Sequence, residues 1–201
     1  MKKSIPSIII IGKVFIILSC NAILGHNLMI MEDILIKMLV VFILGFMPIA
    51  EVRGAIPLAY KLFMIDVRNP LLFSVACLFG ILGNLVIAPL ILFALNKIER
   101  IILRSKFTPS LFKKVYLSLI TYVRVKAKKY ENIEAIGLML FVAIPLPFTG
   151  AWTGSLIAYA LGIDKKKSLL CVELGVLGAS TIVLIAILLF ASLLRILGIK
   201  I

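Results

Sequence analysis

Long runs of apolar residues dominate the pattern along this chain, and the polar positions are gathered into a few short stretches. Leu71–Leu95 contains no charged residue, and Ser168–Leu194 contains one, Glu173. Each run exceeds the roughly 20 apolar residues that a helix needs to span a bilayer. Ile5–Gly25 also qualifies, with Lys13 as its single charge. The pattern therefore predicts a membrane helix in each of these three segments, the first being retained rather than cleaved as a signal peptide.

A further apolar segment, Ile34–Ile65, is broken partway along its length. It is interrupted at Pro48 and resumes for only a short arm after Pro57. That arm has about ten residues, which would rise about 15 Å as a helix, half of the hydrocarbon thickness. An arm of this length is too short to cross, so we predict a re-entrant hairpin with an irregular tip. Unwound backbone at such depth persists only where protein or a water-filled cavity shields it.

The segment Ile133–Ile163 follows the same pattern. Its breaks fall at Pro145, at Pro147 and at Thr149-Gly150. Proline removes a backbone donor, and glycine tolerates backbone conformations that other residues avoid. We therefore predict a second re-entrant hairpin here.

The two broken segments are related in sequence. Pro48–Tyr60 and Pro147–Tyr159 both begin at proline and reach Ala-Tyr twelve residues later. Each then leads into an apolar run with a Gly-x-x-Gly pattern, at residues 80 and 83 in one half and 175 and 178 in the other. Matching breaks in two halves are typical of transporters with a site between inverted repeats. We predict an all-α integral membrane protein: an inverted repeat of a re-entrant helical hairpin plus a transmembrane helix.

The charge distribution agrees with a membrane protein. The chain is 63% hydrophobic and 15% charged, its mean hydropathy is +1.20 and its net charge is +13. Ten of the 22 Lys and Arg residues lie between Lys97 and Lys129, three form 165–167, and two open the chain at 2–3. With re-entrant hairpins all three clusters fall on one side, which the positive-inside rule makes cytoplasmic. No soluble domain is long enough to carry a nucleic-acid surface, so we expect no nucleic-acid partner.

These elements define four expected regions. Residues 1–33 form the first transmembrane helix and an outer loop, and residues 34–95 form repeat 1. Residues 96–132 form a basic cytoplasmic loop, read either as containing a helix on the inner leaflet or as simply solvated. Residues 133–201 form repeat 2. We expect a multi-pass protein of the cell membrane.

Ionisable groups inside a bilayer are costly, so those at depth are functional candidates. Glu51 and Arg53 share the tip of the first hairpin, where a carboxylate could exchange a proton beside a permanently charged guanidinium. The alternative is an ion pair that only satisfies the broken backbone. The second hairpin has no charged residue from 135 to 163 and offers hydroxyls, an indole and free N–H groups. The expected substrate- or ion-binding residues are Glu51, Arg53, Gly54, Asn84, Thr149, Gly150, Trp152 and Glu173.

Three motifs together resemble the small multidrug export protein family: Glu51–Pro57, Gly83-Asn84 and Pro145–Gly154. The similarity covers roughly residues 34–191, and it implies export of small compounds. The layout also resembles DedA-type membrane proteins, which implies translocation of lipid or lipid phosphate. The uncharged second hairpin departs from the DedA-type pattern, where both hairpins carry charged residues.

Three hypotheses for the function follow. The first is a secondary transporter of small compounds, with proton coupling through Glu51. The second is a lipid-phosphate flippase or scramblase, and the third is a structural membrane protein whose hairpins only pack. No paired metal-ligand spacing or Cys-His dyad occurs, and Cys20, Cys77 and Cys171 are far apart, so we expect neither an enzyme nor a metal or cofactor. The expected partners are membrane lipids, a small-molecule or lipid substrate, and a second copy completing a homodimer.

Overall fold

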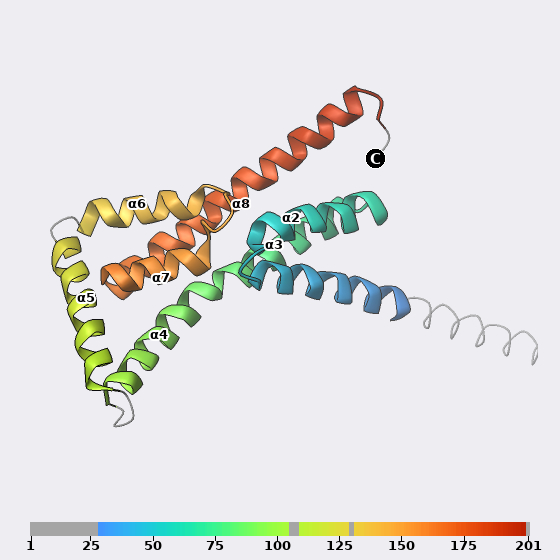
Figure 1. The fold of residues 1–201 in the computed structure, drawn as a ribbon. Coiled ribbons are helices and arrows are strands. Elements are labelled where there is room, and N and C mark those ends of the chain that lie inside the picture. Colours follow the sequence, from blue (N-terminus) through green and yellow to red (C-terminus); the bar gives the residue numbers. More distant parts are fainter. Residues whose placement is uncertain (1–27, 105–108, 129–130, 200–201) are drawn as a thin grey trace, which may run out of the picture. The chain divides into compact units, whose positions relative to one another are not determined.

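The computed structural model describes residues 28–104, 109–128 and 131–199, and within them every regular element is a helix (Figure 1). The chain divides into two units, Met1–Leu39 and Val40–Ile201. The described part of the first unit is helical and contains an ion pair between Lys37 and Asp33, with 2.6 Å between Nζ and Oδ2. The helix predicted over Ile5–Gly25 lies outside the described residues. The fold below is that of the second unit.

The first hairpin comprises residues 40–66. Its first arm is helical to residue 46, residues 47–50 form a turn, and α2 (Glu51–Ala59) leads directly into the π-helical segment η1 (Tyr60–Asp66). The predicted break at Pro48 is confirmed. The predicted break at Pro57 is wrong, because Pro57 lies inside α2. The helix accepts this proline by forgoing one bond: Pro57 has no N–H to donate to the carbonyl of Arg53, one turn earlier.

The second hairpin comprises α6 (Glu131–Ala143), an irregular stretch over residues 144–150, and α7 (Ala151–Leu161). The predicted breaks at Pro145, Pro147 and Gly150 all fall in that stretch. α7 ends at Gly162, whose φ of 72° is the left-handed conformation that favours glycine at a helix end. Asp164 then begins the next helix by accepting a hydrogen bond from the Lys166 N–H at 3.0 Å.

Long apolar helices follow both hairpins. α3 (Pro70–Leu85) begins at Asn69, whose side chain accepts bonds from two N–H groups of the first turn, and α4 (Ile87–Arg104) continues it after Val86. α8 (Lys165–Ile196) follows the second hairpin. Two stretches, Pro70–Ile101 and Lys165–Ile196, are long and apolar enough to cross a membrane. α4 extends beyond the helix expected to end at residue 95, so residues 96–104 are also helical. Most of the remaining described residues of the basic region form α5 (Ser110–Lys128), and residues 131–132 begin α6.

Glycines allow each hairpin to pack closely on the helix that follows it. A Cβ on Gly45 would lie 2.1 Å from the Gly80 carbonyl oxygen, and one on Gly83 would lie 2.3 Å from that of Phe42. In the other half, a Cβ on Gly175 would meet Val142 at 2.6 Å. α8 packs against α2, α3, α6 and α7 and so joins the two hairpins in one core. The Gly-x-x-Gly pairs are therefore helix-packing residues in both halves.

Candidate functional site: the meeting point of the two hairpin tips

Glu51 lies at the tip of the first hairpin, where α2 begins. It is 2% exposed, and its φ of 49° places a non-glycine residue in the left-handed region. Such a conformation costs about 1–3 kcal/mol and persists only where the surroundings impose it. Phe148, at the tip of the second hairpin, has a φ of 67°. Both tips are therefore strained at one residue, and in the first the strained residue is the buried acid.

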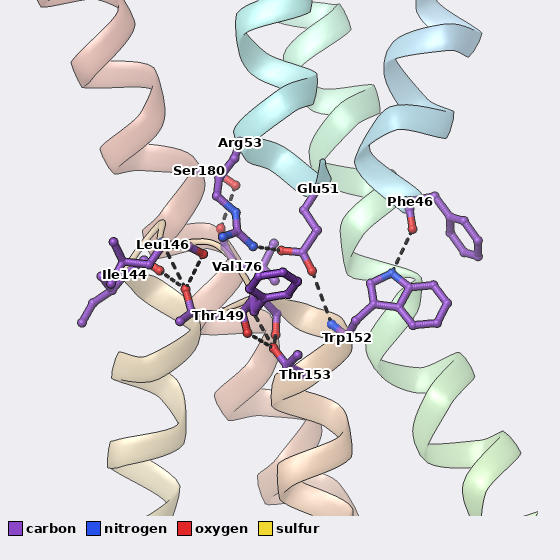
Figure 2. Close-up of polar contacts among 12 residues, drawn as sticks. Phe46, Glu51, Arg53, Ile144, Leu146, Thr149, Trp152, Thr153, Val176 and Ser180 are labelled. Carbon is purple, nitrogen blue, oxygen red and sulfur yellow. Dashed lines mark hydrogen bonds and ion pairs between the residues drawn. The ribbon is translucent and has the colours of Figure 1, made fainter. Parts of the chain in front are cut away.

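Arg53 is the charged partner of Glu51. Its Nη2 donates to Glu51 Oε2 at 2.8 Å, and the two side chains are 16% and 3% exposed (Figure 2). Residues two apart on a regular helix do not face each other. The left-handed backbone at Glu51 departs from helical geometry and turns its side chain back toward Arg53. The predicted pair is thus formed, and its geometry depends on the strained residue.

The Glu51 carboxylate also contacts the second hairpin at the N-terminus of α7. The Trp152 N–H donates to Glu51 Oε1 over 3.5 Å (Figure 2). A Cβ on Gly150 would lie 1.6 Å from Glu51 Oε2. Gly150 is the N-cap residue of α7, and an N-cap side chain normally accepts a bond from the second or third N–H of its helix. Gly150 has no side chain, and the carboxylate of the other hairpin takes that place. Glu51 therefore caps α7 from a distance of about a hundred residues in sequence.

Trp152 forms the reverse contact, from the second hairpin to the first. Its indole Nε1–H donates to the carbonyl of Phe46 at 3.0 Å, and its ring meets the Phe46 ring edge-on with centroids 6.0 Å apart. Phe46 is the last helical residue of the first arm, and the carbonyls in the last turn of a helix lack partners inside it. Each hairpin thus supplies a side chain that satisfies a helix end exposed by the break in the other.

Two threonines hold the irregular stretch of the second hairpin. Thr149 Oγ1 lies 2.6 Å from the carbonyl of Ile144 and accepts the N–H of Leu146 at 3.1 Å. Thr153 Oγ1 accepts the N–H of Gly150 at 3.1 Å and lies 2.7 Å from the Phe148 carbonyl. Thr149 was predicted as a binding residue, but its hydroxyl is engaged with the backbone of its own loop.

The remaining predicted residues are not joined to this cluster by a hydrogen bond or an ion pair. Gly54 lies one residue beyond Arg53, and a Cβ there would lie 2.9 Å from that of Ala50. Asn84 is 1% exposed, and no described residue pairs with its Oδ1. Glu173 is half-buried on α8, and within the described residues no hydrogen bond or ion pair reaches its side chain. Glu51, Arg53, Gly150 and Trp152 are therefore brought together, and Gly54, Asn84 and Glu173 are outside that network.

A second polar cluster, which the sequence analysis missed, lies at the far end of α7. Tyr159 hydroxyl is 3.2 Å from that of Tyr116, and Arg124 lies over the Tyr159 ring with its Cζ 5.4 Å from the centroid. Arg124 also pairs with Glu99 at 3.6 Å, and a cavity of about 260 Å³ adjoins these groups. The repeated Ala-Tyr ending was the only sequence signal for this cluster, because its other members come from the basic region.

The chemistry available at the hairpin tips is that of one carboxylate, one guanidinium and backbone N–H groups. Within the described residues, no three His, Cys, Asp or Glu side chains come close enough to hold a metal. The carboxylate lies in an anion-binding position formed by Arg53 and by the N-terminus of α7. One carboxylate therefore has two partners, one in each hairpin.

Comparison with known protein families identifies one match. The model of the family described as putative small multi-drug export protein matches residues 51–182, well over half of the chain. The match begins at Glu51, the first residue of α2, and extends over the tip of the second hairpin and more than half of α8. No curated protein and no solved structure matches the chain.

Proposed function

The chain belongs to the small multi-drug export protein family, and we therefore propose that this membrane protein exports small compounds through a site between its hairpin tips. The observation that carries the proposal is the double engagement of Glu51. One buried carboxylate neutralises Arg53 and also caps α7 of the other hairpin. A single ionisable group therefore couples the two halves of the molecule.

Protonation of Glu51 supplies the transport step. A neutral carboxyl group no longer attracts Arg53 as an ion-pair partner and is a weaker acceptor for the Trp152 N–H. Arg53 and the N-terminus of α7 then become available to an anionic or polar group of the substrate. When the substrate leaves, Glu51 loses its proton and returns to both partners. Substrate and proton thus exchange at the same position.

The membrane geometry proposed for this exchange is an inverted repeat of two re-entrant hairpins. α7 has 11 residues, which is about 16 Å of helix and half of the hydrocarbon thickness. In the first hairpin, α2 with its 9 residues continues into η1 with its 7, and at about 1.5 Å per residue this arm of about 24 Å is still shorter than the roughly 30 Å of a full crossing. Support also comes from the reciprocal capping by Glu51 and Trp152, because irregular backbone at membrane depth requires partners within the protein. The basic region lies on the cytoplasmic side in this proposal.

Proteoliposomes with an imposed pH gradient test the proposal. Transport is followed with ethidium as a cationic probe and carboxyfluorescein as an anionic one. Glu51→Gln keeps the shape of the side chain but cannot exchange a proton, so it should abolish gradient-driven transport while the protein remains monodisperse. Glu32→Gln, a matched change at an exposed acid, should transport at the rate of the unmodified protein. Gradient-driven transport by Glu51→Gln at that same rate would end the proposed role of Glu51.

A second candidate is translocation of a lipid phosphate, and one observation favours it. The position that Glu51 occupies already binds an anion, through Arg53 and the α7 N-terminus, and a phosphate would find the same donors there. This function requires no ion gradient. A headgroup-accessibility assay in proteoliposomes without any gradient separates the two candidates, because only the second predicts exchange of labelled phospholipid between leaflets under that condition.

A further inference from the structure

A second cavity, of about 740 Å³, lies between η1 with the following turn and the C-terminal end of α8. The residues that line it include Tyr60, Met64, Arg68, Ala191, Arg195 and Ile199. Tyr60 is nine residues after Glu51, about 14 Å along the helix. The cavity is therefore separate from the meeting point of the hairpin tips.

The cavity combines two guanidinium groups with apolar walls. No carboxylate is among its lining residues, and within the described chain neither Arg68 nor Arg195 forms an ion pair or a hydrogen bond through its side chain. Arg53 and Arg124, in contrast, each pair with a glutamate. Two arginines that share a cavity repel each other, and an anion between them removes that repulsion.

The backbone at Arg68 is held in an uncommon conformation. Its φ is 56°, one of three positive values at non-glycine residues in the described chain. The turn is fixed on its far side by Asn69, whose N–H donates to the Phe63 carbonyl at 2.8 Å and whose side chain caps α3. The strained backbone is therefore that of Arg68, which carries one of the two guanidinium groups of the cavity.

We propose that this cavity binds a phosphate group attached to an apolar body. Two guanidinium groups can each donate a pair of parallel N–H bonds to phosphate oxygens, a geometry that lysine cannot reproduce. Met64, Ala191 and Ile199 provide an apolar surface for the attached hydrocarbon, and Tyr60 adds a phenol to the lining. This site is independent of proton exchange at Glu51 and goes beyond the proposed transport activity.

Isothermal titration calorimetry on the full-length protein in detergent tests the site with three probes. They are inorganic phosphate, dihexanoyl phosphatidic acid and dihexanoyl phosphatidylcholine. We expect phosphatidic acid to bind at least tenfold more tightly than phosphatidylcholine, whose choline group screens the phosphate. Binding of inorganic phosphate as tight as that of phosphatidic acid would assign the site to free phosphate rather than to a lipid headgroup, which overturns the apolar half of the proposal.

Two variants and a control complete the test. Arg68→Asn removes the charge but keeps a residue that tolerates positive φ, and Arg195→Gln removes the charge within α8. Each should weaken phosphatidic acid binding at least tenfold. Lys61→Gln removes an exposed cation of η1 that does not line the cavity and should leave binding unchanged.

Two results would contradict the site: unchanged binding in the Arg68→Asn/Arg195→Gln double variant, or an equal loss in Lys61→Gln. Arg195→Lys covers the case in which the double variant is not monodisperse. Lysine at position 195 keeps the positive charge but cannot donate two parallel N–H bonds, so binding of phosphatidic acid should weaken. If this variant binds phosphatidic acid as tightly as the unmodified protein, the proposal is also overturned. Transport of ethidium and carboxyfluorescein is measured on the same variants, so failure of this site is distinguishable from failure at Glu51.

Discussion

The carboxylate of Glu51 occupies the space into which a side chain at Gly150 would project, with Oε2 only 1.6 Å from the position of such a Cβ. The two residues are three positions after the prolines that begin the related segments, Pro48 and Pro147. The repeat thus carries an acid at one position and a glycine at its counterpart, and the two meet. A carboxylate at both positions would place two buried negative charges in contact, and glycine at both would leave α7 uncapped and Arg53 unpaired.

The first prediction concerns the space at Gly150. Gly150→Ala should displace the Glu51 carboxylate and destabilise the protein by about 3–5 kcal/mol, the usual cost of breaking a buried ion pair. The backbone itself does not oppose alanine, since φ is −125° and ψ is −163°. Chemical denaturation in detergent micelles gives the free energy of unfolding.

A double-mutant cycle provides the control for that prediction. In a Glu51→Gly background the carboxylate is gone, so Gly150→Ala should cost less than about 1 kcal/mol. The difference measures the contact between the two positions. Equal costs of Gly150→Ala in the two backgrounds would show that the substitution acts through some other neighbour.

A second prediction exchanges the two residues. Glu51→Gly relieves the left-handed strain at position 51, and Gly150→Asp gives α7 an N-cap side chain of its own. The new aspartate enters the space left by the Glu51 carboxylate, beside Arg53, so that Arg53 keeps a negative partner. The combined variant should therefore unfold at a free energy within about 1–2 kcal/mol of the unmodified protein, since a cap contributes about 1 kcal/mol and strain about 1–3 kcal/mol. Gradient-driven transport should still be lost, because the carboxylate no longer moves with the first hairpin.

Restored stability together with restored transport would contradict that prediction, since the carboxylate would then work from either tip. Restored stability without transport would separate the role of Glu51 in coupling from its role as a cap. The comparison therefore addresses the hypothesis that the hairpins only pack.

The broken hairpins were predictable because proline and glycine act locally. Pro48, Pro145 and Pro147 each deny a helix a backbone donor, and the structure breaks near all three. Pro57 shows the limit of that logic, because α2 accepts it after losing one hydrogen bond. The ion pair of Glu51 and Arg53 was also predictable, since the two residues are two positions apart at one tip.

The contacts between the hairpins were not predictable from the pattern. The Glu51–Trp152 and Trp152–Phe46 bonds join residues 101 and 106 positions apart, and periodicity carries no information about such pairs. Gly150 was predicted as part of a break and as a binding residue, but its contact with Glu51 could not be predicted. Thr149 was predicted to bind substrate because hydroxyls at a break can face a cavity, whereas it satisfies carbonyls that the break itself exposes.

A third prediction isolates the contact from Trp152 to the first hairpin. Trp152→Phe keeps an aromatic ring beside Phe46 but removes the Nε1–H donor, which leaves the Phe46 carbonyl without its bond. The loss should be about 0.5–1.5 kcal/mol, the net contribution of one hydrogen bond, because this bond is only part-buried. Trp152→Ala should cost more, about 3–5 kcal/mol, because the ring contacts are lost as well. Equal losses in the two variants would show that the hydrogen bond rather than the ring carries the contact.

A fourth prediction compares two glycines that lie in helices of the second half. A Cβ on Gly175 would meet Val142 at 2.6 Å and the Met139 carbonyl oxygen at 2.8 Å, whereas one on Gly137 would meet nothing within 4 Å. Gly175→Ala should therefore destabilise the protein by about 1–3 kcal/mol through overpacking. Gly137→Ala should be neutral or should stabilise by up to about 1 kcal/mol, since alanine is the better helix former. Thermal unfolding of the two variants side by side provides the measurement, and destabilisation by both would point to a contact of Gly137 outside the described residues.

The last prediction addresses whether the first hairpin returns to the side from which it enters. Single cysteines at Glu32 and at Asp66 flank that hairpin, and single cysteines at Arg104 and at Lys166 mark the basic side; all four native residues are exposed. The background carries serine in place of Cys20, Cys77 and Cys171. With a re-entrant hairpin, an impermeant maleimide applied to intact cells should label the cysteines at Glu32 and Asp66, while those at Arg104 and Lys166 should react only after permeabilisation. If α2 and η1 instead complete a crossing, the cysteines at Glu32 and Asp66 must react from opposite sides. The proposed re-entrant arrangement, with the contact between Glu51 and Gly150 at mid-depth, requires the former result. A first hairpin that crosses fully would instead invert the membrane orientation of every later element.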